Sequence, residues 1–196
     1  MRNKLFLFII FFAVVSCKNS QQTNNDNSIL NEEKVINTRE SFDFSITSEG
    51  VDKLILGMPF SQITSVYNDF QFEYFEDYCG YAMSNGNISL FLIVVEDTLT
   101  EIQIGDKRFY LENGLKVGST VSEFRKLYPN NPIYFNHHDN IEYFDLKDDN
   151  LYVYLSIESK DGKLLGQYND DIMNDSTLVY DTNGSIIQLN IRKNEP

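Results

Sequence analysis

The residues best suited to proton transfer or metal binding in this sequence are two adjacent histidines. His137 and His138 are the only histidines among the 196 residues, and Asp139 follows them directly. Neighbouring side chains on an extended chain point to opposite sides, so the pair does not readily close on one metal ion. A solvated turn is the alternative, and the sequence holds no His-Glu-x-x-His, Cys-x-x-Cys, Gly-x-Ser-x-Gly or glycine-rich phosphate loop. We therefore predict no catalytic residue and no cofactor.

Three short segments, at 145–149, 170–175 and 181–184, carry acidic side chains that are candidates for cation binding, with a single acid in the last. Ca²⁺ is bound by six to eight oxygen atoms from carboxylates and carbonyls. Asp170, Asp171 and Asp175 offer several such oxygens. Their spacing lacks the register of a calcium-binding loop, so a solvated acidic loop is the simpler interpretation. We predict no metal site, with these three aspartates as the candidates to test.

Tyrosine is the other distinctive residue type, because the chain has 12 Tyr and 15 Phe but no Trp. Tyr152 and Tyr154 alternate with the apolar residues of segment 151–159, so we expect both to lie opposite the apolar face of a strand. Tyr143 and Tyr81 come from other predicted strands. Because tyrosine is enriched in protein interfaces, these four tyrosines are the predicted contacts with a protein or peptide partner.

The elements that must position these residues follow a pattern that occurs twice. Leu54 corresponds to Leu115 and Gly57 to Gly118, an offset of 61 residues. In each copy an extended segment enters the glycine, and apolar residues at helical spacing predict a short helix after it. Pro59 suits the first position of the first helix. The second helix begins with a capping-box pattern over residues 120–123.

Strands are predicted after each helix by alternating apolar residues and turn signals. They cover about 72–78, 80–84, 88–96 and 99–104 in the first copy, and about 133–136, 141–146, 151–159 and 185–192 in the second. The expected fold class is α+β, with two tandem units that each pack a short helix on an antiparallel sheet of three to four strands. The units span 41–111 and 112–196. The second carries an acidic insertion near 160–184, with an extra strand expected at 178–180.

The N-terminal segment is typical of an exported protein. Two basic residues precede an apolar run over residues 5–15, which is shorter than the roughly 20 residues that span a bilayer. The run ends in Val14-Val15-Ser16-Cys17, which resembles a bacterial lipobox, whose cysteine is diacylated and becomes the first mature residue. The resemblance implies a lipoprotein signal peptide at 1–16 and lipidation of Cys17. The polar segment 17–40 then predicts a flexible tether.

The two glycine-turn sequences, Leu54–Phe60 and Gly114–Val121, each followed by antiparallel strands, resemble two known groups. One is the β-lactamase inhibitor protein, which has two such units, and the other is the small lipoprotein of the outer-membrane barrel-assembly machinery, which has one. The resemblance covers about 52–192 and implies architecture and, more weakly, binding. The chain departs from the inhibitor, which has a disulfide in each unit, because a lipidated Cys17 leaves Cys79 single. We expect Cys79 to be a buried, inert thiol, with an intermolecular bond or a reactive thiol as the alternatives.

The charge balance narrows the class of partner. The chain has 16 basic and 29 acidic residues and a net charge of −13, which disfavours nucleic acids and anionic headgroups. An acidic surface steers basic partners. We expect a lipid-anchored binding module of the bacterial cell envelope, at the outer membrane, that recognises a protein or peptide. The alternatives are an envelope hydrolase that uses acidic residues and a structural helper in envelope assembly.

Replacing the expected lipid attachment site, Cys17→Ser, should move the protein from the membrane fraction to the soluble fraction, because the thiol that carries the acyl chains is lost. Cell fractionation with electrophoretic detection of processing measures this change, and Cys79→Ser is the matched control that should stay in the membrane. A Cys17→Ser protein that is still processed and membrane-bound contradicts the assignment.

Overall fold

The computed structural model describes residues 42–147, 151–168 and 174–193. These residues belong to one compact unit, Glu40–Pro196. The expected signal peptide, Cys17, the tether at 17–40, and Asp170 and Asp171 lie outside the described residues. Within the described part of the chain, neither helix has the length and apolar character needed to cross a bilayer.

Strands dominate the described residues. The two α-helices, α1 (Phe60–Val66) and α2 (Val121–Leu127), have seven residues each, and η1 (Glu76–Tyr78) is a single 3₁₀ turn. The strands are β1 (Ser45–Ile46), β2 (Gly50–Val51), β3 (Leu54–Ile55), β4 (Gln71–Phe75), β5 (Gly80–Ser84), β6 (Ser89–Val95), β7 (Thr98–Ile104), β8 (Tyr110–Leu111), β9 (Ile133–Asn136), β10 (Ile141–Lys147), β11 (Leu151–Ser159), β12 (Asn174–Thr177) and β13 (Gly184–Lys193).

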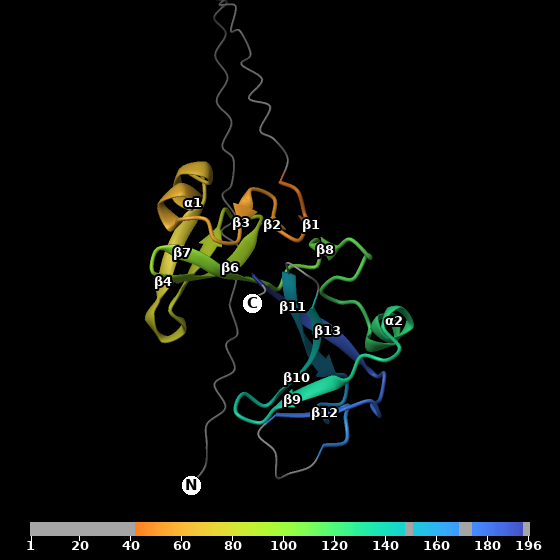
Figure 1. Ribbon diagram of the computed structural model, residues 1–196. Helices are drawn as coiled ribbons and strands as arrows, with labels where there is room; N and C mark the ends of the chain where they lie inside the picture. The colour runs from red at the N-terminus through yellow and green to blue at the C-terminus, as the bar shows by residue number, and fades with distance from the viewer. Residues whose placement is uncertain (1–41, 148–150, 169–173, 194–196) are drawn as a thin grey trace, which may run out of the picture. The chain divides into compact units, whose positions relative to one another are not determined.

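The strands form one long sheet and one small one. The long sheet has nine antiparallel strands in the order β12-β9-β10-β11-β13-β7-β6-β5-β4, with β12 and β4 as its edges (Figure 1). The small sheet has the order β3-β2-β1-β8, and its β1–β8 pair is parallel. Each strand of the small sheet has only two residues.

This architecture corrects the expected α+β class of two units with separate sheets. The fold is mostly β, since strands far outnumber the two short helices among the described residues. The strands that follow both helices also join into one sheet, where β13 pairs with β7. The pairing sets Ile191 opposite Ile102 and Arg192 opposite Glu101. An unpaired edge strand exposes a row of backbone donors and acceptors, and this junction removes two such edges. Two helices of seven residues are too short to form a layer of their own.

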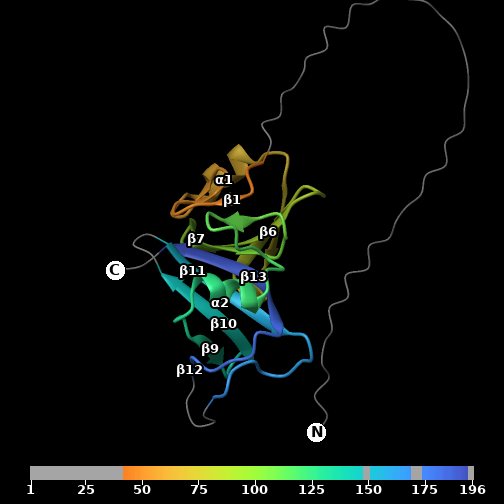
Figure 2. The same ribbon diagram turned by 90° about the vertical axis from the view of Figure 1, so that its right-hand side faces the viewer.

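The register of the long sheet places its buried apolar side chains on one face. Directly paired residues share a face, and Ile191 lies between Val153 of β11 and Ile102 of β7. Both helices pack on this apolar face. Phe124 of α2 stacks on the ring of Phe144 in β10 at 3.7 Å between centroids, and Figure 2 shows α2 beside β10 and β13. The opposite face of the sheet is therefore free of the two described helices.

The helix starts agree in part with the sequence. The capping box of α2 is confirmed, since the Thr120 hydroxyl accepts a hydrogen bond from the Glu123 amide and the Glu123 carboxylate accepts one from the Thr120 amide. Pro59 is the residue that precedes α1 and not its first helical residue, because its ψ of 142° is extended. The helix α2 ends at Leu127, two residues before Pro129.

Two further expectations are wrong. The extra strand lies at Asn174–Thr177, where it pairs with β9, and not at 178–180. An edge strand needs only backbone pairing, so the polar residues of β12 carried no apolar pattern to find. Cys79 is exposed and not buried. It follows η1 in a left-handed conformation with φ of 47°, which turns the chain from β4 into β5.

Replacing a residue at the strand junction, Ile191→Ala, should lower the free energy of unfolding by about 2–5 kcal/mol, because Ile191 is fully buried between both halves of the sheet. The control is Ile187→Ala on the same strand, where the side chain is 43% exposed and the expected loss is about 0.5 kcal/mol. Urea denaturation should give one cooperative transition for both variants. Two separate transitions in Ile191→Ala, with one half unchanged, would show that the halves fold independently.

Candidate functional site: a tyrosine face and its groove

The face of the long sheet opposite the helices carries a stack of three tyrosines. Tyr134 of β9 stacks on Tyr143 of β10 with ring centroids 5.2 Å apart and planes 19° apart. Tyr143 stacks in turn on Tyr154 of β11 at 4.0 Å and 20°. All three side chains are half-buried. We call this surface, with Tyr152 added, the tyrosine face.

Tyr152 extends the tyrosine face toward basic side chains. The Lys147 ammonium lies 5.1 Å from the centre of its ring, and the Arg192 guanidinium carbon lies 5.0 Å away. Both distances suit cation–π attraction. Burial and the nearby Asp145 carboxylate raise the pKa of Tyr152 to about 12. Burial also raises the pKa of Tyr154 above its ordinary value. Phenols are protonated at neutral pH with or without these shifts, so both hydroxyls can donate hydrogen bonds.

A row of polar side chains connects the tyrosine stack to the neighbouring strands. The Gln188 amide donates hydrogen bonds to Asn190 Oδ1 at 2.6 Å and to Gln103 Oε1 at 3.3 Å. The Gln103 amide donates to Glu101 Oε1 at 3.0 Å. Glu101 Oε2 lies 3.6 Å from Arg192 Nε. This chain of contacts crosses the junction between β13 and β7, so it fixes the polar side chains of both halves relative to each other.

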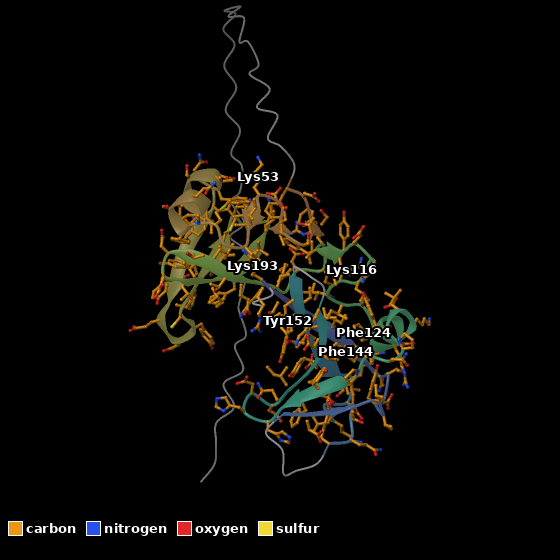
Figure 3. All side chains as sticks on the ribbon, viewed as in Figure 1. Lys53, Lys116, Phe124, Phe144, Tyr152 and Lys193 are labelled. Atoms are coloured by element: carbon orange, nitrogen blue, oxygen red, sulfur yellow. The ribbon has the colours of Figure 1, made fainter. Side chains whose placement is uncertain are left out.

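A groove of about 720 Å³ lies at the end of the tyrosine face, where the start of β7 meets the ends of β10 and β13. Its volume is within the range of ligand-binding pockets. Figure 3 labels Tyr152 and Lys193, which both line it. Among the described lining residues, three are cations and one is a carboxylate. The lining residues are Gly57, Val95, Thr98, Leu99, Thr100, Glu101, Lys147, Tyr152, Arg192 and Lys193.

The structure brings three of the four predicted tyrosines together and separates the fourth. Tyr143, Tyr152 and Tyr154 share the tyrosine face, whereas Tyr81 lies on the helix-covered face. There it stacks on Phe60 of α1 with centroids 4.0 Å apart. Tyr81 pairs directly with Leu92 of β6, which is fully buried. Because directly paired residues share a face, Tyr81 lies on the core side of the sheet. Tyr81 therefore does not belong to the candidate site.

Sequence reasoning missed three residues of the site: Tyr134, Lys147 and Arg192. Alternation along β10 places Lys147 on the same face as Tyr143, so the strand pattern did carry a signal for this lysine. Arg192 could not be found in this way. It meets Tyr152 only through the register of β11 with β13, which no local pattern specifies.

The two histidines do not converge on a site. His137 and His138 lie in the turn between β9 and β10, as expected, and neither lines the groove. The ring of His137 meets the ring of Phe135 edge-on, with centroids 4.5 Å apart. His137 thus packs against an aromatic side chain.

The aspartate candidates are only partly within the described residues. Asp175 lies in β12, whereas Asp170 and Asp171 are outside the described ranges. In the part of the chain that the structure describes, no three His, Cys, Asp or Glu side chains are grouped as metal ligands. Asp175 lies in this edge strand, and the prediction about the three aspartates stays a prediction.

The buried acid Glu142 has a structural environment. It is 4% exposed, and its two carboxylate oxygens accept hydrogen bonds from the amide of Leu165 at 2.8 Å each. Oε1 also accepts from the Gly166 amide and from the Tyr168 hydroxyl, at 2.8 and 2.7 Å. These contacts satisfy the buried charge and fix the segment after β11 against the helix-covered face.

The four carboxyl groups with lowered pKa values are shifted in the direction opposite to the one that a general acid needs. The pKa values of Asp43, Glu123 and Asp161 are lowered by hydrogen bonds from nearby backbone amides. The pKa of Asp106 is lowered by the hydrogen bond that it accepts from the Arg108 side chain. A general acid in a hydrolase requires a raised pKa, so none of these four groups supports the hydrolase alternative.

Known proteins show little similarity to this chain. No protein-family model matches it, and no curated protein matches it. Among solved structures, the crystal structure of the uncharacterized protein YfeY from Escherichia coli is similar, with 12% sequence identity and a TM-score of 0.42. The similarity covers 78% of this chain and 99% of that chain. Because the similarity is this low, the functional proposal rests on the geometry of the tyrosine face alone.

Replacing the buried acid, Glu142→Gln, should lower the free energy of unfolding by about 2 kcal/mol, because an amide group replaces one of the two oxygens that face backbone donors. Hydrogen exchange at the Leu165 and Gly166 amides should speed up at the same time. Glu158→Gln, an exposed position on β11, is the control and should change neither quantity. Equal stability of Glu142→Gln and the original protein would contradict the structural role given to this acid.

Proposed function

We propose that this protein is a lipid-anchored binding module of the bacterial cell envelope, which recognises a protein or peptide partner through its tyrosine face. Cys17 would carry the lipid, and Tyr143, Tyr152 and Tyr154 would contact the partner. The observation that supports this proposal most is the stack of Tyr134, Tyr143 and Tyr154 on the helix-free face of the long sheet. Rigid aromatic side chains with a polar tip are the residues that dominate binding energy in protein interfaces.

The stacking geometry favours a protein or peptide over a sugar. A sugar ring binds best against an open aromatic face, but Tyr143 is covered on one side by Tyr134 and on the other by Tyr154. The Tyr143 ring therefore offers a partner its edge and its hydroxyl group. Protonated hydroxyls that donate hydrogen bonds suit backbone carbonyls and polar side chains of a peptide.

The sheet also gives the tyrosines fixed positions before binding. They come from the adjacent strands β9, β10 and β11, which pair through continuous ladders. The neighbouring Asn190 and Ser156 are buried, so the surface around the stack is held by packed residues. Fixed side chains lose little conformational entropy when a partner binds, and this raises affinity without new contacts.

Site-specific photo-crosslinking tests the proposal in the native envelope. A benzophenone amino acid at position 154 of the full-length protein should give a discrete crosslinked product, and the same amino acid at position 110 is the control. Tyr110 is 43% exposed on β8, away from the tyrosine face. Crosslinking at both positions to the same products, or at neither, contradicts the proposal.

Binding of the crosslinked partner, once purified, should weaken about 30-fold in Tyr154→Ala, because a central aromatic contact contributes about 2 kcal/mol or more. Tyr154→Phe, which keeps the stack and removes only the hydroxyl, should weaken binding less. Tyr110→Ala is the matched control and should bind normally. Thermal unfolding of each variant separates a lost contact from a lost fold.

A further inference from the structure

The groove beside Tyr152 is lined by more cations than carboxylates, although the chain as a whole is acidic. The protein carries a net charge of −13, yet three cations, Lys147, Arg192 and Lys193, line this one groove. They come from the ends of β10 and β13, which the register of the sheet brings together. Lys147 and Arg192 lie beside the ring of Tyr152, and Lys193 lines the same groove.

Two acidic side chains form ion pairs with two of these cations. Asp145 Oδ2 lies 3.6 Å from Lys147 Nζ, and Glu101 Oε2 lies 3.6 Å from Arg192 Nε. The acids are the more buried partners, with side chains 14% and 17% exposed, whereas the lysine and arginine side chains are 61% and 46% exposed. The cations are therefore exposed to solvent, with the acids beside them on the sheet.

Among the described residues, the two ion pairs leave donors of Lys147 and Arg192 for a ligand. The two ion-pair distances of 3.6 Å are longer than a hydrogen bond, so the pairs do not use up the N–H groups. Arginine offers paired donors that match the two oxygens of a carboxylate. Beside the cations, Thr98 and Thr100 line the groove and can add hydroxyl contacts.

We propose that this groove binds an acidic segment of the partner, with a carboxylate side chain held by Lys147 and Arg192 beside Tyr152 and with Lys193 elsewhere on the groove wall. The inference rests on the proposed function, because it gives the chemistry of the segment that lies beside the tyrosine face. It reverses the basic partner expected from net charge. A short acidic peptide fits this charge pattern better than a nucleic acid, since a long polyanion would also meet the acidic remainder of the surface.

Fluorescence anisotropy with a defined probe tests the inference. The probe is a rhodamine-labelled peptide of alternating Gly and Glu, about eight residues long, added to the full-length protein in neutral detergent. The same peptide with Gln in place of Glu is the ligand control. The Glu peptide should bind at least about tenfold more tightly than the Gln peptide, because charged hydrogen bonds are the stronger ones. Equal binding of the two peptides, or binding of neither, overturns the inference.

A matched pair of charge reversals locates the binding. Lys193→Glu should weaken binding of the Glu peptide about tenfold, whereas Lys116→Glu should leave it unchanged. Lys116 is exposed, lies outside the groove near α2, and gives the same change in net charge (Figure 3). An equal loss in both variants shows a non-specific charge effect and overturns the inference.

An anionic lipid headgroup is the alternative ligand that could bring a negative charge to the groove. Vesicles of phosphatidylglycerol mixed with phosphatidylcholine should bind the Cys17→Ser protein and its Cys17→Ser, Lys193→Glu derivative equally weakly. A loss of vesicle binding in the derivative, without peptide binding, assigns the groove to headgroups and overturns the inference. The test of the proposed function is independent of this one. It depends on crosslinking at position 154, whereas the inference about the groove depends on binding of the Glu peptide.

Discussion

The pairing of β7 with β13 holds together both the hydrophobic core and the candidate site. On the helix side it joins Ile102 to Ile191, so the core is continuous across the two halves. On the other side it joins Glu101 to Arg192, whose guanidinium lies beside Tyr152 through the pairing of β13 with β11. The core and the polar side of the groove thus share one strand pairing. A slip of one residue would exchange these faces and destroy both.

The charge around the groove depends on which side chains the strand register brings together, and not on the net charge of the chain. Exposed charges separated by more than about 10 Å are largely screened by salt, so a ligand in the groove responds mainly to the side chains that line it. Asp145 pairs with Lys147, and Glu101 pairs with Arg192. In both pairs the acid is the more buried partner and the cation is the more exposed one. An acidic chain can in this way offer a cationic binding position without losing the solubility that its net charge provides.

Local features of this fold could be predicted from the sequence, whereas its assembly could not. The strand at 151–159 and the capping box at Thr120 are found where local patterns placed them, because periodicity and capping depend on neighbouring residues. Alternation also put Tyr152 and Tyr154 on one face. The single nine-stranded sheet was missed, since a strand does not encode which distant edge it joins. The same limit misplaced Tyr81, whose face is decided by its pairing with β6.

If the proposed function is right, a partner covers the tyrosine face in the envelope. Hydroxyl-radical footprinting with mass spectrometry tests this coverage by comparing tyrosine oxidation in the purified full-length protein and in intact envelopes. We expect reduced oxidation of Tyr143, Tyr152 and Tyr154 in envelopes, with no change at Tyr74 and Tyr78, which are 54% and 69% exposed at the other end of the sheet. Equal oxidation of the tyrosine face in both samples, or protection confined to Tyr74 and Tyr78, would show that no partner covers it.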